Sequence, residues 1–79
     1  MKGVFKMKRE EFEKQFKDCV SKWGFVIVTF NCGRMMVDKY KLFEFGYTHD
    51  GEKYKDSVEF YTSGKYIGAF KLSSVKRLD

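Results

Sequence analysis

The sequence predicts an α+β domain, in which one N-terminal amphipathic helix packs on a four-stranded antiparallel meander in the order α-β-β-β-β. Three observations support this fold class. Residues 8–23 repeat apolar side chains at helical spacing. After Gly24 the pattern changes to short β-branched and aromatic runs, which turn residues separate. The chain has 79 residues, the size of a single domain, and it contains no internal repeat.

The helix has the clearest pattern, KREEFEKQFKDCVSKW over residues 8–23. Its apolar positions fall within about 100° of arc, so one face is expected to cover the sheet. That face consists of Phe12, Phe16, Cys19, Val20 and Trp23. Gly24 follows as a natural C-terminal stop. On the opposite face, acid-before-base pairs at i, i+4 spacing predict a solvated, self-neutralising surface. These pairs are Glu10–Lys14, Glu13–Lys17 and Asp18–Lys22.

Four strands are expected within residues 24–72, the antiparallel sheet. The run FVIVTFN is apolar on both faces, as is typical of a central strand, and NCGR forms a turn. The second strand begins at residues 35–37 and continues through YKLFEFGY. Its apolar parity changes between Leu42 and Phe43, which predicts a β-bulge there. The runs KYKDSVEFYT and KYIGAFKL are the third and fourth strands, bounded by turns at THDG and SG.

The two ends of the domain are basic. Residues 1–7 form an arm that can remain flexible, and residues 73–79 form a tail. The tail segment SSVKRLD is compatible with one helical turn or with a short edge strand, and the pattern does not decide between them. One helix is too small to cover fifteen aromatic rings. Some rings must therefore lie on an exposed sheet face, at a dimer interface or against a partner.

The charge is unevenly distributed along the chain. The total is +5, with +3 over residues 1–23, −1 over residues 24–62 and +3 over residues 63–79. The predicted sheet is therefore not basic as a whole, and the unpaired cations lie near the two chain ends. A patch formed there would suit phosphates or an acidic protein surface.

Catalytic and metal-binding patterns are missing from the sequence. There is no glycine-rich phosphate loop, and one histidine with two cysteines cannot supply a four-ligand zinc site. His49 lies in a predicted turn, where it is expected to be exposed, and Cys19 and Cys32 are expected to be reduced thiols. We therefore expect a non-enzymatic protein that uses no metal and no cofactor.

The longest apolar run, residues 23–30, is far below the roughly 20 residues of a membrane-spanning helix. The N-terminus also lacks the apolar stretch of a signal peptide. These features predict a cytoplasmic protein without a membrane segment.

A small, proline-free, aromatic-rich α+β chain of this kind resembles, in type rather than in any motif, the inhibitors that phages and other mobile elements encode, including anti-CRISPR proteins. The resemblance implies a protein-directed inhibitor or modulator of nucleic-acid-handling machinery, acting in the host cytoplasm. Its partner would be a protein of such a complex, contacted through aromatic anchors. The anchors expected on the sheet are Tyr40, Tyr47, Tyr54 and Tyr61.

The alternative function is direct DNA or RNA binding through residues near the two chain ends. The candidate residues are Lys6, Lys8, Arg9, Lys65, Tyr66, Lys71, Lys76 and Arg77. Whether the N-terminal and C-terminal groups form one patch depends on the fold. A homodimer through the open sheet face is a third arrangement.

Overall fold

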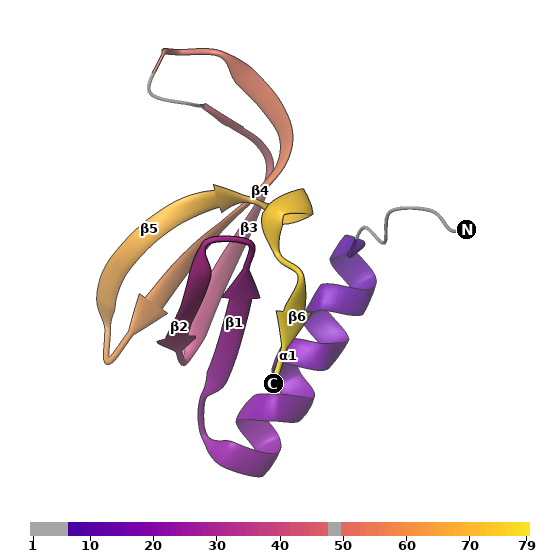
Figure 1. The fold of residues 1–79 in the computed structure, drawn as a ribbon, viewed down its shortest axis with the longest axis vertical. Coiled ribbons are helices and arrows are strands. Elements are labelled where there is room, and N and C mark those ends of the chain that lie inside the picture. The colour runs from indigo at the N-terminus through magenta and orange to yellow at the C-terminus, as the bar shows by residue number, and fades with distance from the viewer. Residues whose placement is uncertain (1–6, 48–49) are drawn as a thin grey trace.

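The computed structural model describes residues 7–47 and 50–79 of the chain. These residues form one α-helix, six strands and one 3₁₀ turn (Figure 1). The elements in chain order are α1 (Arg9–Trp23), β1 (Val26–Phe30), β2 (Gly33–Val37), β3 (Lys39–Tyr47), β4 (Lys53–Thr62), β5 (Lys65–Lys71), η1 (Leu72–Ser74) and β6 (Arg77–Leu78). The α+β class is confirmed. The single four-stranded meander is corrected to two three-stranded antiparallel sheets, ordered β2-β1-β6 and β3-β4-β5.

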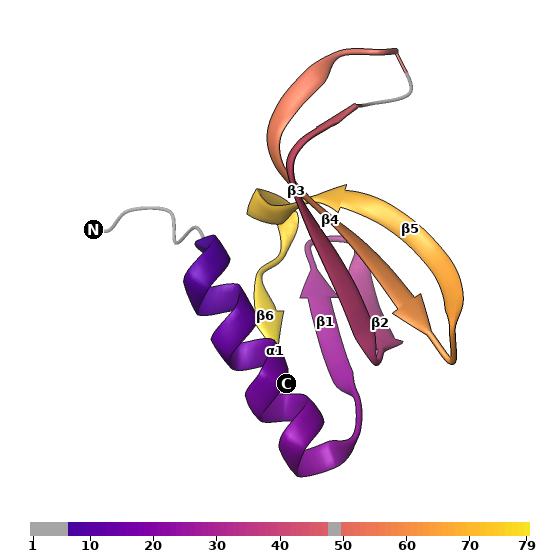
Figure 2. The same ribbon diagram turned by 180° about the vertical axis from the view of Figure 1, so that it is seen from behind.

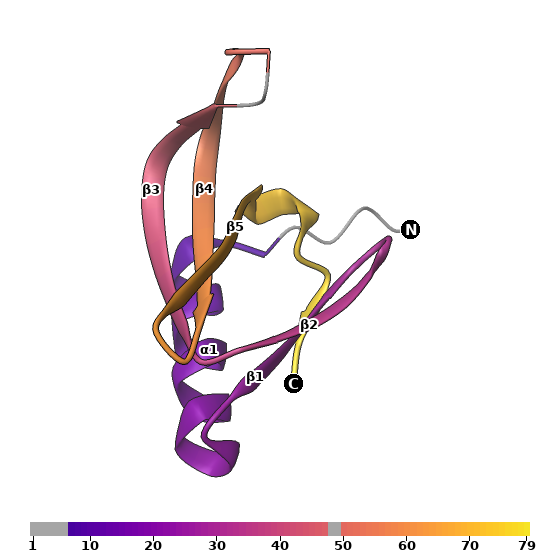
Figure 3. The same ribbon diagram turned by 90° about the vertical axis from the view of Figure 1, so that its left-hand side faces the viewer.

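A bend at Asp38 divides the predicted second strand between the two sheets. β2 pairs with β1, whereas β3 pairs with β4, and Asp38 is the only residue between β2 and β3. The Asp38 N–H donates to the carbonyl of Tyr61, and its carboxylate accepts from the Ser63 N–H at 2.9 Å. The bend lets both sheets turn an apolar face toward one core, so that they cross steeply in Figure 3.

The helix α1 closes one side of the space between the two sheets (Figures 1 and 2). Phe12 and Phe16 are buried, and Gly24 caps the helix at φ 82°, with its N–H donating to the carbonyl of Val20. The prediction that Trp23 covers the sheet is wrong, because its side chain is 63% exposed. The last helical turn extends past the ends of β3 and β5 (Figure 1), and Trp23 lies at the edge of an open groove that Ile27 of β1 and Leu78 of β6 also line.

The C-terminal tail contains both of the predicted structures, a helical turn followed by a short edge strand. Residues 72–74 form the 3₁₀ turn η1, and β6 then adds to the edge of β1, with Leu78 opposite Val28. The main chains of Ile27 and Asp79 exchange two hydrogen bonds of 2.8 and 3.0 Å. Leu78 is 7% exposed, so this short strand contributes to the core.

The predicted bulge at Leu42 and Phe43 is wrong, since the β3–β4 register runs unbroken through both residues. The irregularity lies instead between β4 and β5, next to Phe60 and Tyr61. The apolar parity changes because both faces of β3 carry apolar side chains. Leu42 packs against the core, whereas Phe43 is half-buried on the opposite face.

The core lies between the two sheets and α1. Phe60 of β4 is fully buried at its centre, with ring contacts to Phe12, Phe16, Phe30 and Phe70. The expected basic arm over residues 1–7 falls outside the described residues except for Met7, which is 5% exposed and belongs to the core. The expected turn at THDG likewise falls partly outside them.

Candidate binding face on the β3–β5 sheet

The β3–β4–β5 sheet has one face in the core and one face that no described helix or strand covers (Figure 2). Val58 and Phe60 of the central strand are fully buried, so the side chains between them point outward. We call this second side the outer face. The strand register places three cross-strand rows on it: Lys39–Tyr61–Tyr66, Lys41–Glu59–Ala69 and Phe43–Ser57–Lys71.

A shallow hollow of about 290 Å³ lies on the outer face near the β3–β4 hairpin. Its lining residues are Phe43, Phe45, Gly46, Tyr47, Tyr54, Ser57, Glu59 and Ala69. The hollow thus extends the face toward the hairpin and adds further aromatic rings to it. Its volume is close to the lower limit of about 300 Å³ that is typical of small-molecule sites.

Gly46 permits the close packing inside this hollow. A Cβ atom at this position would lie 2.7 Å from Ser57 Cβ and 2.8 Å from Tyr54 Cζ. The Tyr54 ring therefore lies against the β3 main chain where any larger residue at position 46 would hold it away. Ser57 beneath it is only 3% exposed.

Three lysines of this region lie over aromatic rings. The Lys53 ammonium is 4.0 Å from the centre of the Phe45 ring. Lys71 lies 5.3 Å from the ring centre of Tyr54, and Lys41 lies 5.5 Å from that of Phe43. Such cation–π contacts are worth about 0.5–1 kcal/mol at exposed sites. The face therefore alternates positive charges with π surfaces.

A tyrosine pair occupies the other end of the face. The Tyr61 and Tyr66 rings meet edge to face at 5.8 Å, and Tyr66 is 56% exposed. The Tyr61 hydroxyl donates to Glu59 Oε1 at 2.8 Å. This hydrogen bond to a carboxylate is the main reason that the pKa of Tyr61 is raised above 10.0.

The fold sorts charges that are mixed in the sequence. Glu59 is the one carboxylate in the three rows that the described strands form. Four lysines belong to the outer face or contact its rings: Lys39, Lys41, Lys53 and Lys71. Two nearby acids are engaged elsewhere. Asp38 accepts a hydrogen bond at the strand bend, and Asp56 pairs with Arg9 at 3.8 Å. A segment that is slightly acidic over residues 24–62 therefore presents a basic face.

The predicted tyrosine anchors are separated by the fold. Tyr54 and Tyr61 lie on the outer face, half-buried, and Tyr47 is 67% exposed near its end. Tyr40 lies on the core side, where its hydroxyl donates to Glu13 Oε2 at 3.0 Å. Burial, followed by this hydrogen bond, raises the pKa of Tyr40.

The predicted basic residues are also dispersed. Lys65 opens β5 at the β4–β5 turn, far from the start of α1, whereas Lys71 and Tyr66 belong to the outer face (Figure 1). Lys76 precedes β6, and Arg77 pairs with Asp79 at 2.7 Å. Lys6 lies outside the described residues.

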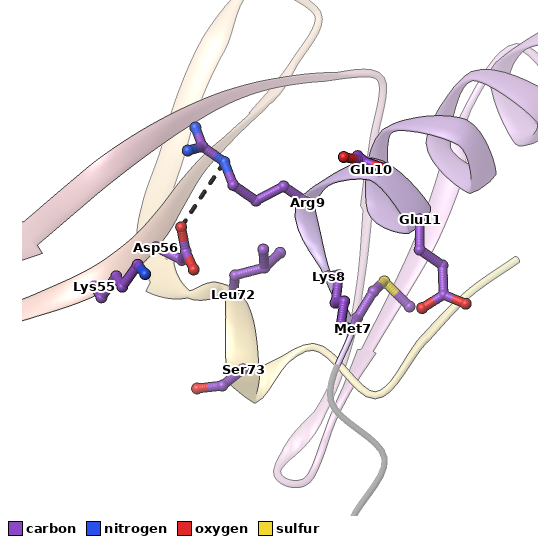
Figure 4. Close-up of a pocket in the computed structure, with 9 residues that line it drawn as sticks. All are labelled: Met7, Lys8, Arg9, Glu10, Glu11, Lys55, Asp56, Leu72 and Ser73. Atoms are coloured by element: carbon purple, nitrogen blue, oxygen red, sulfur yellow. Dashed lines mark ion pairs between the residues drawn. The ribbon is translucent and has the colours of Figure 1, made fainter.

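Lys8 and Arg9 line an open cleft of about 1070 Å³ between the start of α1, β4 and η1 (Figure 4). Three basic and three acidic side chains balance there: Lys8, Arg9 and Lys55 against Glu10, Glu11 and Asp56. The Arg9 side chain extends toward Asp56 across the cleft (Figure 4). Because its charges cancel, the cleft lacks the excess of positive charge that the outer face carries.

The sequence interpretation did not assign Lys39, Lys41, Phe43, Phe45, Lys53 or Glu59 to a site. The signal that could have found several of them is the period-two alternation of Lys39, Lys41 and Phe43, which places all three on one side of a strand. The alternation alone does not place Tyr54, whose ring lies against Gly46 in the hollow.

Residues 7–47 and 50–79 contain no group of three side chains able to hold a metal ion, and no helix among them is long and apolar enough to cross a membrane. Cys19 and Cys32 are free thiols. Burial, with the carboxylates of Asp79 and Asp18, raises the pKa of Cys19.

Comparisons with protein-family models, with curated proteins and with solved structures found no match for this chain.

Proposed function

We propose that this protein is a non-enzymatic binding protein that holds single-stranded nucleic acid, DNA or RNA, on its outer face. The observation that carries the proposal is the set of three lysines placed over aromatic rings on an uncovered sheet face. Single strands expose both features that this face complements. Their bases have π surfaces that stack on rings, and their phosphates attract ammonium groups.

The free energies of the two interactions favour displacement of the lysines from the rings by the bases of a nucleic acid. A lysine held over an exposed ring gains about 0.5–1 kcal/mol, whereas a base stacked on that ring gains about 1–3 kcal/mol. Phe45, 44% exposed beneath Lys53, is the ring best placed for such an exchange. The released ammonium remains close enough to contact a phosphate of the same strand. Duplexes, whose bases are already stacked, would gain only the phosphate contacts.

The test is fluorescence anisotropy with labelled oligothymidylate, oligouridylate and a duplex of equal length. We expect the single strands to bind more tightly than the duplex. The logarithm of the association constant should fall with the logarithm of the salt concentration, with a slope of about −2 to −3 for three or four neutralised phosphates.

Variants identify the face that is used. Phe45→Ala should weaken single-strand binding by about 5- to 150-fold, the equivalent of one stacked base. Met36→Ala, which removes a 54% exposed apolar side chain from β2, is the matched control and should bind normally. Lys41→Gln with Lys71→Gln should flatten the salt slope. The pair Lys14→Gln and Lys17→Gln on the helix should leave it unchanged.

Two results would overturn the proposal. The first is failure to bind any single strand at about 50 mM salt. The second is binding that Phe45→Ala leaves intact. If Lys65, Lys76 and Arg77 substitutions abolished binding instead, the chain-end alternative would replace the outer face.

A protein-directed inhibitor of the phage or mobile-element type is the second candidate. It is favoured by the exposure of Trp23 beside a groove of about 430 Å³ at the end of α1, where Phe25 and Ile27 are half-buried. Exposed aromatic anchors of this kind are frequent binding hot spots. A partner from nucleic-acid-handling machinery that Trp23→Ala releases and Phe45→Ala retains would favour this function, in the cytoplasm of the host cell.

A further inference from the structure

Glu59 places a negative charge on the outer face, which is proposed to contact phosphates. It lies in the central strand and the central row of the outer face, with Lys41 and Ala69 opposite. A carboxylate there repels the backbone of any bound strand. It is also the one charged residue among the described residues that line the 290 Å³ hollow. Glu59 is therefore expected to have a role other than contact with phosphate.

The geometry leaves acceptor capacity on this carboxylate. Oε1 accepts the Tyr61 hydroxyl at 2.8 Å, which holds the side chain on the face. Among residues 7–47 and 50–79, Glu59 belongs to none of the ion pairs. An ionised carboxylate has about four lone-pair positions, so one hydrogen bond leaves most of them available. The small Ala69 across the row leaves room beside it.

We infer that Glu59 makes the hollow select guanine, an inference that rests on the proposed function. The Watson–Crick edge of guanine carries adjacent N1–H and N2–H donors, which a single carboxylate can accept together. Cytosine and adenine offer one amino group beside an acceptor nitrogen. Thymine and uracil offer one N–H between two carbonyl oxygens that a carboxylate repels. Bases in single strands expose this edge, and stacking on Phe43, Phe45 or Tyr54 would present it to Glu59.

The experiment compares short oligothymidylates with one central position changed to guanine, inosine, adenine or cytosine. We expect the guanine strand to bind on the order of tenfold more tightly than the unchanged strand, as for a two-donor base contact. Inosine lacks the N2 amino group and should lose most of the preference. The adenine and cytosine strands should bind like the unchanged strand.

Glu59→Gln tests the residue itself. It removes the charge at equal size and should abolish the preference for guanine, while it leaves binding of unchanged oligothymidylate equal or tighter. Glu44→Gln, an exposed acid on β3, removes the same charge and should keep the preference. Retained binding of oligothymidylate by Glu59→Gln shows that the variant is folded, and a thermal melt checks this independently.

The possible failures are distinguishable. If the wild type binds oligothymidylate but shows no preference for guanine, or if Glu59→Gln keeps that preference, the inference is wrong while the proposed function stands. If no strand of any composition binds, the proposed function fails, and the inference fails with it.

Discussion

Tyr40 contributes to the contact between the helix and the sheet through both its ring and its hydroxyl. The ring meets Phe16 at 4.7 Å and Phe12 at 5.2 Å, both edge to face, and the hydroxyl donates to Glu13 of α1. The side chain expected to anchor a partner thus holds α1 against β3. Gly46 is a second residue whose role depends on its neighbours, because its missing side chain gives Tyr54 its place in the hollow.

Alkaline pH should reveal the Tyr40 contact. Burial and the Glu13 hydrogen bond raise the pKa of Tyr40 in the folded protein above the usual 10.0. The folded state therefore holds this proton more tightly than the unfolded state. The resulting stability is fully present below pH 10 and is lost as the pH rises through the folded pKa. Tyr40→Phe, which keeps the ring, should lower the free energy of unfolding at pH 7 by about 0.5–1.5 kcal/mol.

Urea unfolding at several pH values measures this effect. The wild type should lose its advantage over Tyr40→Phe above pH 10, whereas Tyr47→Phe, at a 67% exposed position, should behave as the wild type throughout. A constant difference between wild type and Tyr40→Phe up to pH 12 would refute the proposed cause.

At the scale of elements, β3 shows how alternation creates a surface. Side chains at every second position point to one side of a strand, so Lys39 and Lys41 leave the core together while Tyr40 and Leu42 enter it. Local patterns predicted α1, β1, β4 and β5, because helix and strand periods are properties of neighbouring residues, but they joined β2 and β3 into one strand. They did not predict the pairing of β6 with β1, since that pairing joins residues distant in the chain.

The shortest strand, β6, is expected to contribute far more to the free energy of unfolding than its length suggests. Leu78→Ala should lower the free energy of unfolding by about 2–5 kcal/mol, because Leu78 packs in the core opposite Val28. Arg77→Ala is the control in the same strand. Its exposed ion pair with Asp79 contributes little, and the change should stay within about 0.5 kcal/mol. Equal effects in chemical denaturation would contradict the placement of β6 against β1.

At the scale of the whole molecule, one aromatic side chain connects all the layers. Phe60 of the β3–β5 sheet contacts Phe30 of the other sheet and both helix phenylalanines, Phe12 and Phe16. A domain of 79 residues has a total stability of about 4–12 kcal/mol. Phe60→Ala should remove about 3–5 kcal/mol of it.

We therefore expect Phe60→Ala to destabilise helix and sheets together in one transition. For each protein, far-UV circular dichroism of the helix and near-UV circular dichroism of the tyrosines, which all belong to β3, β4 or β5, should give one common midpoint. Phe45→Ala, which truncates an outer-face ring, should leave the midpoint nearly unchanged. Separate transitions for the two probes would show that the layers are stabilised independently.

Local sequence patterns were sufficient for the α+β class, the end of α1 at Gly24 and the positions of β1, β4 and β5. These features depend on side-chain periodicity and turn residues within a few positions of each other. The strand bend at Asp38, the pairing of β6 with β1 and the exposure of Trp23 emerged only from the tertiary structure. So did the basic outer face, because strand pairing brings Lys71 of β5 over the Tyr54 ring of β4, and the contact between α1 and β4 pairs Asp56 with Arg9.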